Sequence, residues 1–141
     1  VDSVKRYIEH NKNLNNVAYI AELPSTQRSL GLSSCDIAIV TLGEGMFGLG
    51  VPSKAYFSMA ANRPILAIMN EDTEVSHMVT AYQIGWVDSS NQAQKLAQLI
   101  DEICEKKLAT HVVSPRMILE QHYHQDVLLE KFIEILRAEN D

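Results

Sequence analysis

The residues best suited to chemistry gather in a glycine-rich segment near the middle of the chain. Four of the six glycines fall between positions 43 and 50, and Ser53 and Lys54 follow shortly after. Glycine adopts positive φ readily and lets a ligand approach the backbone closely. A helix that begins here would offer free N–H groups and the positive end of its dipole. With the hydroxyl of Ser53 and the ammonium group of Lys54, this arrangement suits a phosphate group.

The same segment also has a purely structural interpretation. A glycine-rich connection between a strand and a helix can be only a tight turn, and Lys54 can be a solvated residue of the first helical turn. The spacing matches neither the GxGxxG pattern nor the P-loop pattern. On the residues alone, phosphate binding and a simple turn both remain open.

The histidines and cysteines give no metal or redox motif. His122 and His124 flank Tyr123 without convincing zinc partners, so we expect no metal site. Cys35 and Cys104 each lie among apolar residues and are expected to be reduced thiols of the core, which suits the cytoplasm. The sequence therefore predicts neither a bound metal nor a bound cofactor.

Composition limits the classes of function. The chain has 141 residues, enough for one domain with a real core, and a formal net charge of −6. This charge, without any basic stripe, argues against nucleic acid as the main partner. No apolar run approaches the roughly 20 residues that a membrane helix needs. Because the chain opens directly on a helical pattern without a methionine, we expect it to be a piece of something longer.

The periodicity of apolar residues predicts alternating strands and helices that would position the glycine-rich segment. We expect strands at 17–21, 36–42, 64–69 and 85–88, and helices at 2–11, 26–32, 52–61, 74–82, 93–104, 115–123 and 125–138. Ser25 and Asn91 are the expected N-caps of two of these helices. Trp86 is an expected core residue, with stacking on a base as the minor alternative. The alternation predicts a single α/β domain over residues 1–141, with a Rossmann-like parallel sheet, right-handed crossovers and helices on both faces.

Residues 35–68 also resemble a known family. The specific stretches are Cys35–Val40, Val51–Tyr56 and Met59–Ala67, joined by the glycine-rich segment. They are similar to the family-four retaining glycosyltransferases, above all to bacterial members that build surface polysaccharides. The resemblance continues through the closing helices and covers essentially the whole chain. It implies the C-terminal half of a GT-B fold, with the first strands of that half missing.

The resemblance implies a donor-binding domain of a two-domain enzyme. In that family the C-terminal domain grips a nucleotide diphosphate sugar, here expected to be a UDP-sugar. The N-terminal domain holds the acceptor, expected to be a lipid-linked glycan of O-antigen or exopolysaccharide synthesis at the cytoplasmic face of the plasma membrane. Such enzymes need no metal. A helix start and basic side chains stabilise the departing diphosphate, and the isolated domain would be inactive.

The site residues follow from the same resemblance. Catalytic roles are expected for Glu44 and Lys54, although Glu44 can equally be an exposed loop acid. The donor diphosphate is expected at Gly50, Val51, Pro52, Ser53 and Lys54, the donor sugar at Glu44, Gly45, Met46, Phe47 and Gly48, and the nucleobase at Glu22, Leu23 and Pro24. Pro24 can alternatively serve only to end a strand.

Two positions depart from the family pattern. Phe57 stands where many relatives carry a second glutamate, so the contact with the ribose must come from elsewhere. Asn62 replaces a turn glycine, which is physically easy because asparagine tolerates the left-handed conformation. The missing strands would leave a sheet edge uncovered, and we expect self-association or altered pairing to compensate. Two other functions stay open: another GT-B enzyme, such as a nucleotide-sugar epimerase, and a non-catalytic Rossmann-like interaction module.

Overall fold

The computed structural model describes residues 2–11, 13–14, 16–20, 22–43, 45, 50–105 and 113–138. The chain forms two compact units, Val1–Gly31 and Leu32–Asp141. Among the residues that the structure describes, all strands and all buried side chains belong to the second unit. The edge of the sheet where a ligand can bind therefore belongs to that unit as well.

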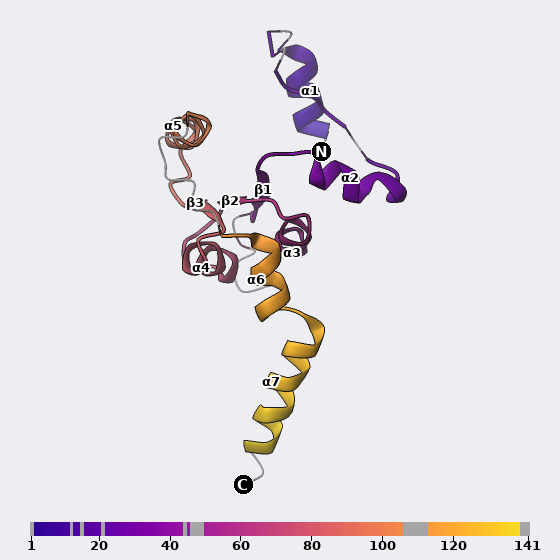
Figure 1. Ribbon diagram of the computed structural model, residues 1–141. Coiled ribbons are helices and arrows are strands. Elements are labelled where there is room, and N and C mark those ends of the chain that lie inside the picture. Colours follow the sequence, from indigo (N-terminus) through magenta and orange to yellow (C-terminus); the bar gives the residue numbers. More distant parts are fainter. Residues whose placement is uncertain are drawn as a thin grey trace. The chain divides into compact units, whose positions relative to one another are not determined.

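A parallel sheet forms the centre of the second unit (Figure 1). Its strands are β1 (Ala38–Thr41), β2 (Ile65–Ile68) and β3 (Gly85–Asp88), in the order β1-β2-β3. The register aligns the three strands residue for residue, so Thr41, Ile68 and Asp88 stand side by side at their ends. The prediction of a Rossmann-like α/β sheet is confirmed, because each expected strand from residue 36 onward is present.

Two helices connect the strands and cover one face of the sheet. Helix α3 (Ser53–Ala60) follows β1, and helix α4 (Glu74–Ala81) follows β2. Right-handed crossovers between parallel strands place both helices on the same face. Their side chains pack with those of the strands into one core of Val40, Ala55, Met59, Ile65, Ala67, Met69, Val75, Met78, Val79, Ile84 and Ile118. Burial of each large apolar side chain contributes about 1.5–3 kcal/mol.

The opposite face is less covered at β1. Ile39, whose neighbours in register are Leu66 and Trp86, has 56% of its surface exposed. Leu66 is buried, but Trp86 is only half-buried. The expectation that Trp86 belongs to the core is therefore wrong, because this face lacks the close packing that α3 and α4 give the other.

The start of α4 is fixed by a small hydrogen-bond network. The Thr73 hydroxyl accepts the Ser76 N–H at 3.2 Å and donates to the Asn70 carbonyl at 2.9 Å. The Ser76 hydroxyl also donates to the Asn70 carbonyl, at 2.8 Å. Thr73 and Ser76 are both buried, so these bonds satisfy polar groups that would otherwise destabilise the fold.

Three helices close the chain: α5 (Ala93–Cys104), α6 (Pro115–His122) and α7 (Gln125–Ala138). Their predicted positions are confirmed within a residue. Helix α6 packs on α3, whereas α7 has no buried residue and exposes large apolar side chains. These are Leu128, Leu129, Phe132, Ile133, Ile135 and Leu136. Within the described ranges, no helix has the length and apolar character to cross a membrane.

The contact between α3 and α6 depends on Asn62. Its φ of 56° lies in the left-handed region, as its replacement of a glycine predicted. Its Oδ1 accepts the Ser114 hydroxyl at 2.8 Å and the Arg116 N–H at 3.2 Å. The Arg116 Nε–H donates to the Ala60 carbonyl at 2.9 Å. One residue thus ends α3 and fastens the start of α6.

The first unit contains α1 (Asp2–His10), the 3₁₀-helix η1 (Ser25–Gln27) and the beginning of α2 (Arg28–Ser33). The strand expected at 17–21 is wrong over its described part, since Val17–Ile20 are neither helical nor paired. A strand needs a neighbour for its N–H and C=O groups, and the described part of this unit offers none.

Three smaller expectations are also wrong. Ser25 does not cap its helix, because it lies inside η1 and Pro24 holds the cap position without a side-chain bond. Asn91 does not cap α5, because its φ of 50° is left-handed and Gln92 holds the cap position. An N-cap residue instead requires extended backbone angles. Cys104 is exposed rather than buried.

Candidate functional site

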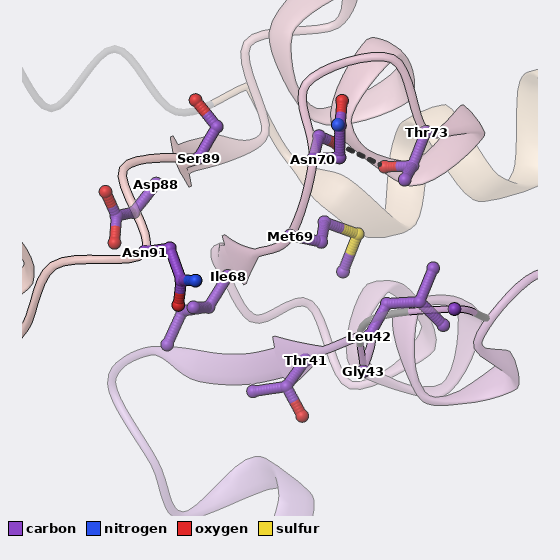
Figure 2. A pocket seen from close by; sticks show the side chains of 11 residues that line it. Thr41, Leu42, Gly43, Ile68, Met69, Asn70, Thr73, Asp88, Ser89 and Asn91 are labelled. Carbon is purple, nitrogen blue, oxygen red and sulfur yellow. Dashed lines mark hydrogen bonds between the residues drawn. The ribbon is translucent and has the colours of Figure 1, made fainter. Parts of the chain in front are cut away.

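The aligned strand ends border an open cavity of about 520 Å³ (Figure 2). In open α/β sheets, ligands bind at this edge. We call this hollow the strand-end cavity. Its walls come from the segments that follow all three strands: Thr41, Leu42, Gly43, Gly45, Ile68, Met69, Asn70, Thr73, Asp88, Ser89 and Asn91.

Asp88 is the buried charged residue of this cavity, with 8% of its surface exposed. Its Oδ1 accepts the Ser90 N–H at 3.1 Å, and its carbonyl accepts the Met69 N–H at 3.1 Å. Asn70 Oδ1 accepts the Asp72 N–H at 2.8 Å. These bonds fix the turns after β2 and β3, so the polar wall of the cavity is held by the backbone.

A second cavity, of about 220 Å³, lies beside the first turn of α3. We call it the helix-start cavity. It is lined by Leu42, Gly50, Val51, Pro52, Asp72, Thr73, Glu74 and Val75. Because Leu42 and Thr73 line both cavities, the two hollows adjoin. Pro52 provides no side-chain cap for α3, and the first N–H groups of a helix have no acceptor within it.

The electrostatics of the helix-start cavity are mixed. The dipole of α3 and its free N–H groups attract an anion. The exposed carboxylates of Asp72 and Glu74 line the same cavity and oppose it. Ser53 and Lys54 are exposed in the first turn of α3 and do not line the walls. A diphosphate bound here would be stabilised most if the flexible Lys54 side chain turned toward it. The positive charge of Lys54 would then offset the two carboxylates.

The structure brings together part of the predicted site. Gly50, Val51 and Pro52 line the helix-start cavity, and Gly45, with φ of 81°, lines the strand-end cavity. Their expected ligand contacts stay predictions. The remaining residues of the predicted sugar-binding loop, including the predicted catalytic acid, lie outside the described residues: Glu44, Met46, Phe47 and Gly48.

The residues predicted to meet the nucleobase belong to the first unit. Glu22 Oε1 accepts a bond from Arg28 Nη2 at 3.3 Å, and both side chains are exposed. Leu23 contacts Gly31, and Pro24 precedes η1. Each of the three therefore has a local structural role, and their predicted role in binding a base remains a prediction.

Sequence reasoning missed the polar residues after β2 and β3. Asn70, Asp88 and Ser89 were not singled out, and Asn91 was interpreted only as a helix cap. A signal was present, because each follows or ends a strand of a predicted parallel sheet. Carboxyl ends of such strands share one edge, so polar residues at several of them converge.

An aromatic cluster joins helices α3, α4 and α6 at Tyr56, Tyr82, His122 and Tyr123. The rings of Tyr56 and Tyr123 lie 5.5 Å apart, and those of Tyr82 and His122 lie 4.8 Å apart. Burial, followed by the nearby Tyr82, Tyr56 and Glu74, raises the pKa of Tyr123 to about 12. Burial and then Glu74 also raise the pKa of Tyr56. Both phenols stay protonated at neutral pH, and His122 has a packing role.

Across the described ranges, no three side chains of histidine, cysteine, aspartate or glutamate lie close enough together to hold a metal ion.

Comparison with known proteins gives one informative result. No family model matches the chain, and no solved structure matches it significantly. A "Probable glycosyltransferase WbjE" of Pseudomonas aeruginosa is 47% identical over 137 residues, which cover 97% of this chain and 34% of that protein. The chain thus spans about a third of the relative's length. Nearly all of this chain is therefore similar to one part of a probable glycosyltransferase.

Proposed function

We propose that the complete protein is a glycosyltransferase and that this chain binds its nucleotide diphosphate sugar donor. The observation that carries the proposal is the 47% identity to a probable glycosyltransferase along 97% of the chain. The uncapped start of α3 beside an open cavity supports it, because such a helix end suits a phosphate group.

The diphosphate binds at Gly50, Val51 and the first N–H groups of α3, with Lys54 as its counter-ion. As the bond between the anomeric carbon and the phosphate oxygen breaks, negative charge grows on the diphosphate. Fixed N–H groups and an ammonium group stabilise that charge, which is commonly a large part of catalysis. The acceptor hydroxyl attacks the same face of the anomeric carbon, and its proton passes to the departing phosphate oxygen. Glu44 orients the sugar.

The finer assignment rests on the resemblance of residues 35–68. By this assignment the enzyme is a family-four retaining glycosyltransferase of GT-B architecture. Its donor is a UDP-sugar, and its acceptor is a lipid-linked glycan of surface-polysaccharide synthesis. The acceptor is held by a separate N-terminal domain, at the cytoplasmic face of the plasma membrane. The chain by itself binds the donor and does not turn it over.

Calorimetric titration of the protein with UDP, GDP and their sugar conjugates tests the proposal. We expect a uridine nucleotide to bind, and the amide resonances of Gly50 and Val51 to shift in NMR spectra. An absence of binding by every nucleotide in the panel would favour a non-catalytic interaction module instead.

A further inference from the structure

The strand-end cavity has a chemistry different from that of the helix-start cavity. Asp88 is the one charged side chain among its described lining residues, and no lysine, arginine or histidine lines it there. A phosphate group placed in it would face a buried carboxylate without a compensating cation. Bringing like charges together in a partly desolvated site is strongly unfavourable. This cavity is therefore unsuited to the diphosphate.

The polar groups of the cavity instead match hydroxyl groups. The Asp88 carboxylate uses Oδ1 for the Ser90 N–H, while a carboxylate has about four acceptor positions. Thr41 and Ser89 carry hydroxyls, and Asn70 carries an amide that both donates and accepts. A sugar hydroxyl needs such partners, because it donates one hydrogen bond and accepts others.

The apolar part of the wall suits the remaining surface of a sugar ring. Leu42, Ile68 and Met69 line the same cavity (Figure 2). They can contact the C–H groups of a ring while the polar residues bind its hydroxyls. The volume of about 520 Å³ lies within the roughly 300–1,000 Å³ typical of small-molecule sites.

We infer that the strand-end cavity binds an uncharged sugar ring and that Asp88 accepts hydrogen bonds from its hydroxyl groups. Asp88 and Asn70 are thereby residues that bind the hydroxyl groups of this ring. The inference deepens the proposed function and rests on it for the source of the ring. The cavity adjoins the helix-start cavity through Leu42 and Thr73, so one sugar nucleotide can reach both.

The Met69 methyl group provides a direct probe of occupancy. The protein is labelled with ¹³C at its methionine methyl groups, and Met69→Leu identifies the Met69 signal. The buried core residues Met59 and Met78 serve as internal references. The ligands are pyrophosphate, UDP, a panel of UDP-hexoses and UDP-N-acetylhexosamines, and the corresponding methyl glycosides.

We expect the Met69 signal to shift with a sugar-bearing ligand and to stay unmoved by pyrophosphate. A shift with UDP-sugars but not with UDP identifies the donor sugar as occupant, whereas a shift with UDP alone identifies the ribose. A shift caused by pyrophosphate, or no shift with any sugar, overturns the inference.

Asp88→Asn adds a second measurement. Asparagine keeps an oxygen for the Ser90 N–H but removes the charge and one acceptor. Since hydrogen bonds to a charged group contribute about 1.5–3 kcal/mol, its affinity for the sugar ligand should fall at least roughly tenfold. Asp101→Asn, on the exposed surface of α5, is the matched control and should bind like wild type. Equal affinities of the Asp88→Asn protein and wild type would also overturn the inference.

These outcomes separate the two proposals. If nucleotides bind but no sugar moves Met69, the inference fails and the donor-binding function stands. If no nucleotide binds but methyl glycosides move Met69, the proposed function fails and the sugar site stands.

Discussion

At the scale of single residues, Asn62 combines a conformational and a bonding role. Its left-handed φ of 56° ends α3, and its side-chain oxygen accepts two bonds from the start of α6. The conformation could be predicted from the residue type, because asparagine tolerates this region. The bonds could not, because Ser114 is 52 positions away and only the packing of α6 on α3 brings it near.

Asn62→Ala should therefore lower the free energy of unfolding by about 2–5 kcal/mol, the sum of a left-handed penalty and two lost hydrogen bonds. Asn62→Gly, which has no such penalty, should lower the free energy of unfolding by a smaller amount. Urea denaturation of both variants measures the difference. Equal losses would show that the side-chain bonds alone matter.

Lys54 is the proposed counter-ion of the diphosphate. Lys54 is exposed in the first turn of α3, and its charge would offset Asp72 and Glu74, which line the adjacent cavity, once its side chain turned toward a bound diphosphate. Lys54→Ala should weaken nucleotide binding at least roughly tenfold, as expected for loss of a charged partner. Calorimetry with UDP measures it, and Lys95→Ala on α5 is the control. Unchanged affinity in the Lys54→Ala protein would remove this residue from the site.

At the scale of elements, strand β3 packs against β2 with no spare room at its first residue. A Cβ at Gly85 would collide with the carbonyl group of Ile65, whose backbone pairs with it. Gly85→Ala should therefore destabilise the protein by about 3 kcal/mol or more, because the sheet must separate locally. Gly43→Ala is the control, since a Cβ there meets nothing within 4 Å. Thermal unfolding compares the two, and similar melting temperatures would contradict this account.

The aromatic cluster should produce a dependence of stability on pH. Tyr123 has a pKa of about 12 when folded and 10.0 otherwise, so the folded state holds its proton more tightly. The stabilisation is complete below pH 10 and is lost as the pH rises toward 12. Urea midpoints across this range should fall, and Tyr123→Phe should flatten the decline. Tyr7→Phe, which removes an exposed phenol from α1, is the control. A decline of the same steepness in the Tyr123→Phe protein would be inconsistent with this origin.

The elements that could be predicted from the sequence share a strong apolar pattern. β1 lies in a continuous run rich in β-branched residues, β2 lies in a continuous apolar run, and α3 to α7 have clear helical periodicity. Residues 17–20 have the composition of a strand but no described neighbour in their unit to pair with, and composition cannot supply one. The N-caps failed for a similar reason, because capping depends on backbone angles that Ser25 and Asn91 do not adopt. The strand-end cavity was missed since it forms only when three strands are brought into register.

At the scale of the whole molecule, the two units differ in burial. No described residue of Val1–Gly31 is buried, whereas Leu32–Asp141 contains the core. Amide hydrogens of β2 should therefore exchange slowest, and those of α1 should exchange several orders of magnitude faster. Hydrogen exchange followed by mass spectrometry measures this contrast. Equal protection would show that α1 is stabilised by contacts beyond its own unit.

The residue-for-residue alignment of the three strands has an evolutionary consequence. Because Thr41, Ile68 and Asp88 end their strands in one row, a single substitution there or just after changes the rim that a ligand meets. The ladder bonds between strands come from the main chain and persist through such exchanges. Proteins that share this sheet can therefore change their ligand preference through single substitutions at this edge. Each intermediate along such a path still folds.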